Sequence, residues 1–189
     1  KLNGKIIIQK SEAKFLGLLM DNKLPWYSHI IQLCKKLSSV CYILRTLKHT
    51  VSFDIFGLFQ SVMMYGLVFW ELSSSSNDVF KIQTQALRYM EGVKLYYSCK
   101  ALIKKYKILT LPSLFILQIL LRVHSKRAEF VKNNELLSHS LRSSDDLYQN
   151  FARLNVTQKH PNYVAVQNLE VLGISVWKEF ENALEPLVF

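Results

Sequence analysis

The apolar positions of the first fifty residues change from short runs to a helical repeat. Residues 5–9 and 14–20 are apolar runs joined by the polar residues 10–13, which predicts two strands with a tight connection. Gly17, inside the second run, indicates a bulge or a close approach of another backbone. Over residues 25–48 apolar side chains recur at steps of three and four, which predicts one face of a long helix.

The next segments also have helical patterns. Residues 52–70 are apolar almost all round, which predicts a central buried helix. Residues 79–90 form an amphipathic helix that Gly92 is expected to end. A long helix is predicted from Thr110, as its N-cap, to about residue 132.

The pattern weakens toward the end of the chain. Residues 135–150 are polar and serine-rich, and short alternating stretches within residues 151–171 predict one or two weak strands. Residues 175–187 are expected to form a final amphipathic helix. The predicted fold class is therefore mainly α: a helical bundle preceded by a short β-hairpin and followed by a weak β/α segment.

Composition allows a folded core in an intracellular protein. The chain has 189 residues and is 50% hydrophobic, which suits one domain, or one domain with an appendage. Three cysteines without a Cys-x-x-Cys spacing argue against a disulfide framework and favour a reducing compartment, the nucleus or cytoplasm. No signal peptide is expected in residues 1–14, and a start at Lys1 suggests a piece of a longer protein.

Charge is distributed unevenly and points to a polyanionic partner. The net charge is +10, with nine basic and two acidic side chains in residues 1–50 and nine basic and one acidic in residues 94–132. The segments between and after these two blocks are net acidic. We expect the blocks to form one basic face after folding. The alternative is a set of solvated lysines on amphipathic helices.

The sequence holds no recognisable catalytic or metal-binding constellation. The five histidines are scattered, and the pair Asp145–Asp146 has no third hard ligand nearby, so no catalytic residue and no metal ligand is assigned. The uncharged stretch over residues 55–70 is shorter than the roughly 20 residues of a membrane span, and we interpret it as a core helix.

Residues 94–107 are the best local candidate for binding nucleic acid. This segment holds five lysines, three tyrosines and no acid. Lysines contact phosphates without sequence preference, and tyrosines stack on bases or pack on sugars. The alternative is that some of the tyrosines, Tyr96, Tyr97 and Tyr106, pack within a short helix.

Several short motifs in order resemble one family. They are Lys14–Phe15–Leu16–Gly17, residues 21–26 (DNKLPW), Cys34–Lys35–Lys36–Leu37, Tyr65–Gly66 with Trp70, and residues 107–114 (KILTLPSL). Together they resemble the region after the catalytic palm in jockey-like or LINE-type non-LTR retrotransposon reverse transcriptases, over about residues 5–180.

The resemblance implies a role for each part. Phe15, Leu16 and Gly17 would be the primer grip within residues 1–24, residues 25–93 a thumb-like helical bundle, residues 94–134 a basic helical region and residues 135–189 a mixed C-terminal region. The partners would be template–primer nucleic acid and the palm and fingers of the polymerase, with no membrane. The nucleic-acid contacts we expect are Lys35, Lys36, Arg45, Lys48, Lys94, Lys100, Lys104, Lys105 and Lys107.

The chain also departs from that family. The catalytic aspartates lie upstream of the grip in such enzymes, so this chain is predicted to be inactive alone and to need no cofactor, whereas the full polymerase would use Mg²⁺. Ser140–Leu141–Arg142, Leu172–Gly173 and Glu71 replace residues that are usual in the family. Two other hypotheses remain: a helical module for protein interaction or membrane association, and a translated transposon remnant without function.

Overall fold

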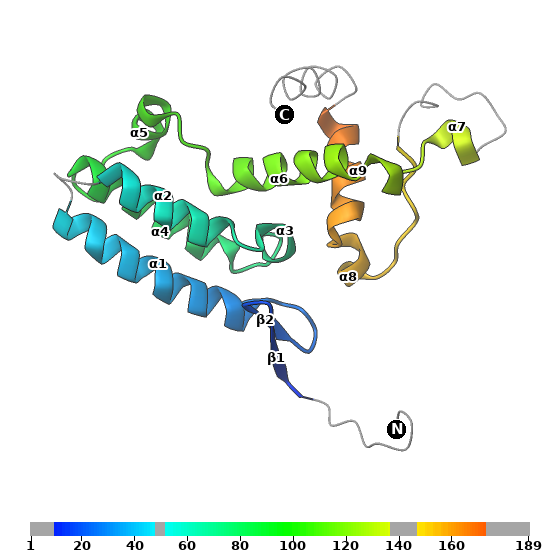
Figure 1. Ribbon diagram of the computed structural model, residues 1–189, viewed down its shortest axis with the longest axis horizontal. Coiled ribbons are helices and arrows are strands. Elements are labelled where there is room, and N and C mark those ends of the chain that lie inside the picture. Colours follow the sequence, from blue (N-terminus) through cyan, green and yellow to red (C-terminus); the bar gives the residue numbers. More distant parts are fainter. Residues whose placement is uncertain (1–9, 48–51, 137–146, 173–189) are drawn as a thin grey trace. The chain divides into compact units, whose positions relative to one another are not determined.

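The computed structural model describes residues 10–47, 52–136 and 147–172, and they form two compact units. Unit 1 ends at Pro112 and unit 2 begins at Ser113. Figure 1 shows that helices predominate and that a two-stranded hairpin lies near the N-terminus, as the sequence predicts. The predicted strand at residues 5–9 and the predicted helix at residues 175–187 lie outside the described residues.

The hairpin of unit 1 begins later than predicted. Strand β1 (Glu12–Phe15) pairs antiparallel with β2 (Leu18–Asp21), and Phe15 lies opposite Leu18 beside the turn. The single apolar run 14–20 therefore contains the end of one strand, the turn and most of the other strand. Gly17 lies in the turn with φ 84°, a left-handed conformation that glycine adopts without a steric cost. Of the two predictions for Gly17, the bulge is wrong for that reason, and the atoms nearest to a Cβ there belong to the Tyr65 side chain rather than to another backbone.

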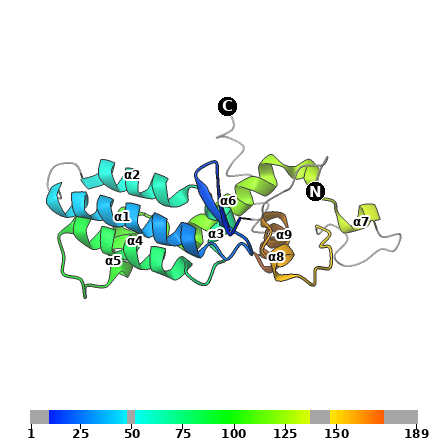
Figure 2. The same cartoon turned by 90° about the horizontal axis from the view of Figure 1, so that it is seen from below.

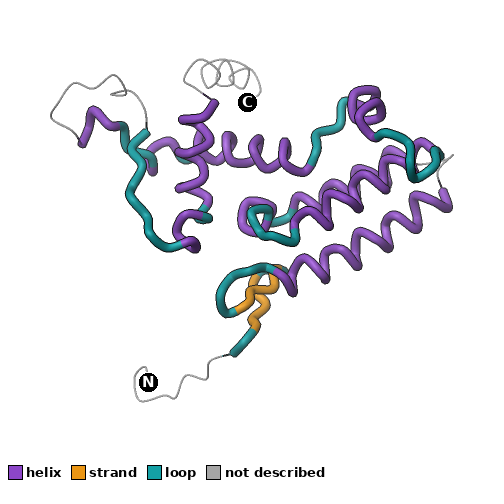
Figure 3. The backbone as a smooth tube through the Cα atoms, turned by 180° about the vertical axis from the view of Figure 1, so that it is seen from behind, coloured by secondary structure: helices purple, strands orange, loops and turns teal. Residues whose placement is uncertain are grey.

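A bundle of α1 (Tyr27–Leu47), α2 (Ser52–Met64) and α4 (Ser76–Glu91) forms the core of unit 1. The predicted stripe of α1 is confirmed, because its buried side chains follow the steps of three and four. The bundle and the hairpin are drawn as purple and orange tubes in Figure 3. The main buried side chains of the bundle are Ile30, Leu33, Leu37, Leu44, Phe56, Phe59, Met63, Val79, Ala86 and Leu87.

The predicted buried helix over residues 52–70 is broken. Helix α2 ends at Met64, Gly66 takes a left-handed φ of 64°, and a short α3 (Leu67–Trp70) follows. One face of this stretch is exposed, at Phe53, Leu58, Tyr65 and Phe69, so the prediction of burial all round is wrong. The apolar composition continues through the point where the chain changes direction, so it does not reveal the break. Gly66 is the residue in the sequence that indicates it.

Helix α4 ends at Gly92, as predicted, with φ 74° and bonds from the N–H groups of Gly92 and Val93 back to the last turn. Helix α5 (Cys99–Tyr106) follows the loop and packs against α4. Helix α6 (Leu111–Ser125) begins after Thr110 and ends before residue 132.

Unit 2 is helical where strands were predicted. After the 3₁₀ turn η1 (Arg127–Glu129) come α7 (Asn133–Leu136), α8 (Asn155–Gln158) and α9 (Pro161–Leu172), and an isolated bridge joins Lys132 to Leu147. The weak strands predicted within residues 151–171 are therefore wrong. Pro161 at the first position of α9 is the helix-start signal in this segment.

Two interactions tie α9 to the rest of unit 2. Arg122 Nε of α6 donates to Asn162 Oδ1 at 2.9 Å, and the α9 side chains of Val164 and Ala165 are buried. These contacts are made between parts of the chain that are distant in sequence, so the local alternating pattern that predicted strands does not reveal them.

Candidate nucleic-acid interface

The tip of the hairpin is an exposed two-residue turn. Leu16 and Gly17 both have left-handed φ angles, 46° and 84°, which is the conformation of the tight turns that join paired strands. Leu16 is 73% exposed, and Phe15 beside it is also exposed. The three residues predicted as a primer grip therefore form a projecting tip with two apolar side chains on its surface.

Tyr65 joins this tip to the helices. Its hydroxyl donates to the carbonyl of Leu16, and its own carbonyl accepts from Trp70 Nε1 at 3.1 Å. Gly66 allows the approach, because a Cβ at this position would lie 2.6 Å from Leu18 Cδ2. Tyr65 was missed as a site residue. Its only signal in the sequence is the Tyr65–Gly66 pair at the interruption of the apolar stretch.

A cleft of about 330 Å³ lies between the turn and the helices α1 and α2. Lys36 lines it together with Gly17 and Tyr65, so one predicted phosphate contact and one of the three predicted grip residues share one concave surface. Lys36 makes no ion pair with the other described residues. The remaining lining residues are His29, Gln32, Leu33, Ser61 and Val62.

His29 is the buried polar residue of this cleft. It is 7% exposed, and its Nδ1 accepts a bond from the N–H of Leu19 at 3.4 Å. The proton of the neutral ring is therefore on Nε2, which has no partner among the described residues. Burial, and then the charge of Lys36, lower the pKa of His29, while Asp21 acts in the opposite direction.

This lowered pKa predicts a stability that falls in acid. Between the folded-state pKa of His29 and about 6.5, the unfolded chain binds more protons than the folded chain, so its contribution is lost as the pH falls through that window. Urea unfolding of the wild type and of His29→Asn from about pH 8 to pH 5 measures the pH dependence of the free energy of unfolding that His29 causes. The stability gap between the two proteins should narrow in acid, and a constant gap would contradict the prediction.

The predicted basic contacts within the described residues are all exposed. Lys48 lies outside that part of the chain. The exposed contacts are Lys35, Lys36 and Arg45 on α1, Lys94 in the loop after α4, Lys100, Lys104 and Lys105 on α5, and Lys107 just after it. Lysine-bearing helix faces are therefore available to a ligand in unit 1.

Lys105 differs from the other basic residues because it has an acidic partner. Its Nζ lies 2.6 Å from Glu91 Oε1, and the hydroxyl of Tyr106 donates to the same carboxylate. These two bonds lower the pKa of Glu91, and the bond to Glu91 is the main cause that raises the pKa of Lys105. Lys105 and Tyr106 therefore secure α5 to the end of α4, and Lys105 does not belong among the free phosphate contacts.

The two basic blocks lie on helices that flank α4. Figure 2 shows α1 and α5 on either side of α4, and each of them contacts it. Lys35 and Lys36 of α1 are consequently separate from Lys100 and Lys104 of α5. The predicted single basic face is therefore divided: Lys36 lies beside the cleft, whereas Arg45, in the last turn of α1, lies at the end of the bundle where the loop to α5 begins.

Neither metal-binding groups nor membrane spans stand out in the described residues. No group of three or more His, Cys, Asp or Glu side chains is placed to hold a metal ion among them. Asp145–Asp146 lies outside this part of the chain. No single described helix is both long and apolar enough to cross a membrane, although the bent pair α5 and α6 reaches that length and composition together.

Comparison with known proteins gives no match: no family model, no curated protein and no solved structure resembles the chain significantly. The similarity to non-LTR reverse transcriptases therefore stays a prediction from the sequence.

Proposed function

We propose that unit 1 binds the backbone of template–primer nucleic acid without sequence preference, as the primer-grip hairpin and thumb of a non-LTR retrotransposon reverse transcriptase. The observation that carries the proposal is the cleft in which the hairpin turn and Lys36 meet. A projecting turn beside a cationic helix suits a nucleic-acid strand that is held by its phosphates rather than by its base edges.

The charges of unit 1 support this proposal. Helix α1 holds Lys35, Lys36 and Arg45 and no acidic residue, so a phosphate approaching it meets no like charge on that helix. Contacts of this kind follow the shape and charge of a duplex and ignore its sequence. Phosphoryl transfer and its Mg²⁺ belong, in this proposal, to the palm of the parent polymerase, and the chain contributes binding.

The salt dependence of binding tests the proposal. Fluorescence anisotropy with a labelled RNA–DNA hybrid duplex should give an affinity that falls steeply as salt rises, because bound lysines release counterions. Replacing Lys35 and Lys36 by glutamine should lower the slope of log affinity against log salt by about 2, roughly one for each phosphate that the variant can no longer neutralise.

Lys81→Gln is the matched control for that experiment. Lys81 is an exposed lysine of the same unit, but it already pairs with Asp78 at 2.8 Å, so its replacement should leave the slope nearly unchanged. Absence of binding, or an affinity that ignores salt, would contradict the proposal and favour a remnant without function.

A protein-interaction module is the second candidate, favoured by the exposed apolar side chains Phe53 and Leu58 on α2. Exposed apolar side chains that gather in one patch mark contact surfaces. Sedimentation separates the two candidates: a self-association that Phe53→Ser and Leu58→Ser abolish, without nucleic-acid affinity, supports the second.

A further inference from the structure

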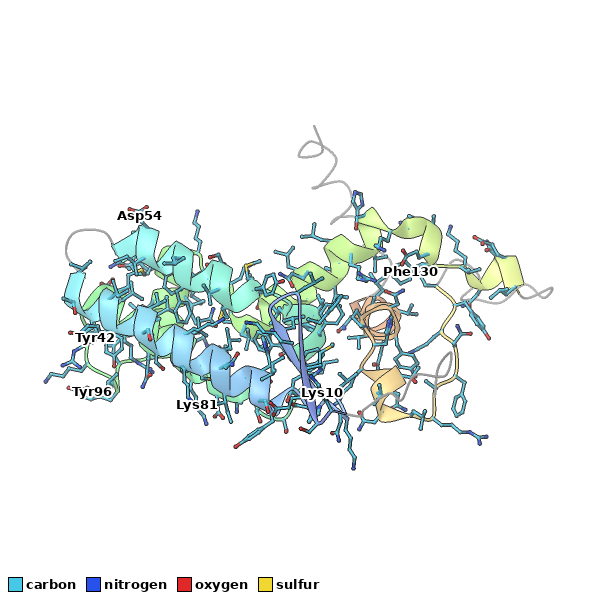
Figure 4. All side chains as sticks on the ribbon, turned by 60° about the horizontal axis from the view of Figure 1, so that its bottom comes forward. Lys10, Tyr42, Asp54, Lys81, Tyr96 and Phe130 are labelled. Carbon is cyan, nitrogen blue, oxygen red and sulfur yellow. The ribbon has the colours of Figure 1, made fainter. Side chains whose placement is uncertain are left out.

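The far end of the helical bundle in unit 1 gathers exposed aromatic and basic side chains. Figures 1 and 2 both show α1 and α4 finishing at this end, where the loop to α5 begins. Figure 4 places Tyr42 of α1 and Tyr96 of the loop there. We call this surface the bundle end and define it by Tyr42, Arg45, Lys94, Tyr96 and Lys100.

Its tyrosines are not packing residues. Tyr96 is 81% exposed and Tyr42 is 70% exposed, so both rings face solvent over most of their area. Tyr106, from the same lysine-rich segment, shows the contrast: it is half-buried, its hydroxyl bonds to Glu91 and its ring contacts Phe53. The alternative role of packing within a helix therefore fits Tyr106 and does not fit Tyr96.

The charges around these rings are positive. Lys94 Nζ lies 5.7 Å from the centroid of the Tyr96 ring, close enough for a cation–π contact. Arg45 and Lys100 are exposed. Glu91, the acid closest in sequence to Lys94 and Tyr96, is already bonded to Lys105 and to Tyr106. Asp54, in the first turn of α2, is an exposed acid at this same end of the bundle. A phosphate chain approaching Tyr96 therefore meets cations and a flat aromatic ring, with the carboxylate of Glu91 already paired.

This combination selects unpaired nucleotides over a duplex. In a duplex the faces of the bases are covered by their neighbours, so an exposed ring finds only sugars and phosphates. An unpaired strand offers free base faces, and stacking of a base on an aromatic side chain adds to the phosphate contacts. Lys94 lies over the Tyr96 ring, so the ring can contact the cation and a stacked base at the same time.

We infer that the bundle end binds single-stranded nucleic acid, with unpaired bases stacked on Tyr96 and Tyr42 and phosphates beside Arg45, Lys94 and Lys100. The inference rests on the proposed nucleic-acid binding of unit 1 and adds the strand type and two residues, Tyr42 and Tyr96, as its stacking platform. The strand can be RNA or DNA, because both have the same stacking faces and phosphates.

Anisotropy with three probes tests the inference on the full chain. The probes are labelled oligouridylate and oligothymidylate of about 12 nucleotides and a blunt hybrid duplex of similar length, at one low salt concentration. The double variant Tyr42→Ala/Tyr96→Ala should bind both single strands about tenfold more weakly or worse, with duplex affinity changed by less than about twofold. The two single-stranded probes distinguish RNA from DNA.

Two further variants separate stacking from other effects. Tyr42→Phe/Tyr96→Phe keeps the rings and should retain single-strand affinity. Tyr27→Ala removes a tyrosine that is 59% exposed at the opposite end of α1, and it should leave binding unchanged. Circular dichroism checks that each variant is folded, which the exposure of all three rings favours.

The outcomes distinguish this inference from the proposed function. If the double alanine variant leaves single-strand binding intact, or weakens duplex binding equally, the bundle end is not a stacking platform, although the proposed backbone binding stands. If the wild type binds none of the three probes, the proposed function fails and this inference fails with it.

Discussion

Replacing Trp70 by alanine should lower the free energy of unfolding by about 3–5 kcal/mol, the range for a large aromatic side chain removed from a core. Trp70 is fully buried, and its ring lies 6.3 Å from that of His29, measured between centroids. The cavity left by Trp70 would therefore open next to His29, which lines the cleft. Urea unfolding followed by circular dichroism measures the change.

Phe69→Ala is the control for this prediction. Phe69 is the neighbouring aromatic residue on α3, but its side chain is exposed, so its removal should cost much less. Equal destabilisation by the two variants would contradict the assignment of Trp70 to the core. Trp70→Phe separates the hydrogen bond from the packing, since it keeps an aromatic ring and leaves the carbonyl of Tyr65 without its donor.

The effect of Trp70 extends to the proposed interface. Its Nε1 holds the carbonyl of Tyr65, and the hydroxyl of Tyr65 holds the carbonyl of Leu16 in the turn. A buried core residue is thus connected to the exposed hairpin turn through two hydrogen bonds. We expect Trp70→Phe to weaken binding of hybrid duplex while most of the helical signal in circular dichroism remains.

The sequence predicts well what a repeating pattern determines. The stripe of α1, with Ile30, Leu37 and Leu44 buried, follows from spacing alone, and so does the exposure of Lys35 and Lys36 between those positions. The left-handed end of α4 at Gly92 is equally local, because only the backbone freedom of glycine is involved.

Interactions between distant residues cannot be obtained from such patterns. The bond from Tyr65 to Leu16 spans 49 positions, and the pair of Lys105 with Glu91 spans 14. The first interaction creates the candidate site and the second removes a predicted member from it. Lys105 carries no local signal that differs from an ordinary surface lysine, and Tyr65 has only its pairing with Gly66.

The errors in unit 2 and in the hairpin have different physical causes. Short apolar or alternating runs suit a strand and a buried helix equally, and tertiary contacts decide between them. Bonds such as the one from Arg122 to Asn162 decide for helix in unit 2. In the hairpin, the left-handed turn at Gly17 sets the register, and an apolar run that continues through the turn hides it.

Gln83 should be the most sensitive polar residue of the bundle. It is fully buried on α4, its Nε2 donates to the carbonyl of Leu109 at 3.0 Å, and its Oε1 accepts from the N–H of Leu111 at 2.9 Å. One side chain thus pairs a backbone group between α5 and α6 and another at the first residue of α6. Its amide has the donor and the acceptor that this arrangement needs.

Gln83→Met keeps the length of the side chain and removes both bonds. The buried N–H of Leu111 and the part-buried carbonyl of Leu109 would be left without their partners. At about 1–3 kcal/mol for a buried group, we expect the free energy of unfolding to fall by about that amount for Leu111, with a smaller addition for Leu109. Gln85→Met makes the same chemical change at an exposed position two residues further along α4 and should cost little.

Hydrogen exchange gives the second measurement for this prediction. In Gln83→Met the amide of Leu111 should lose protection, because its acceptor is gone. Helix α1 packs on the other side of α4. The exchange rates of its amides should change only as far as the global stability changes. If Gln83→Met and Gln85→Met were equally stable and Leu111 stayed protected, the paired hydrogen bonds would not be what connects α4 to this segment.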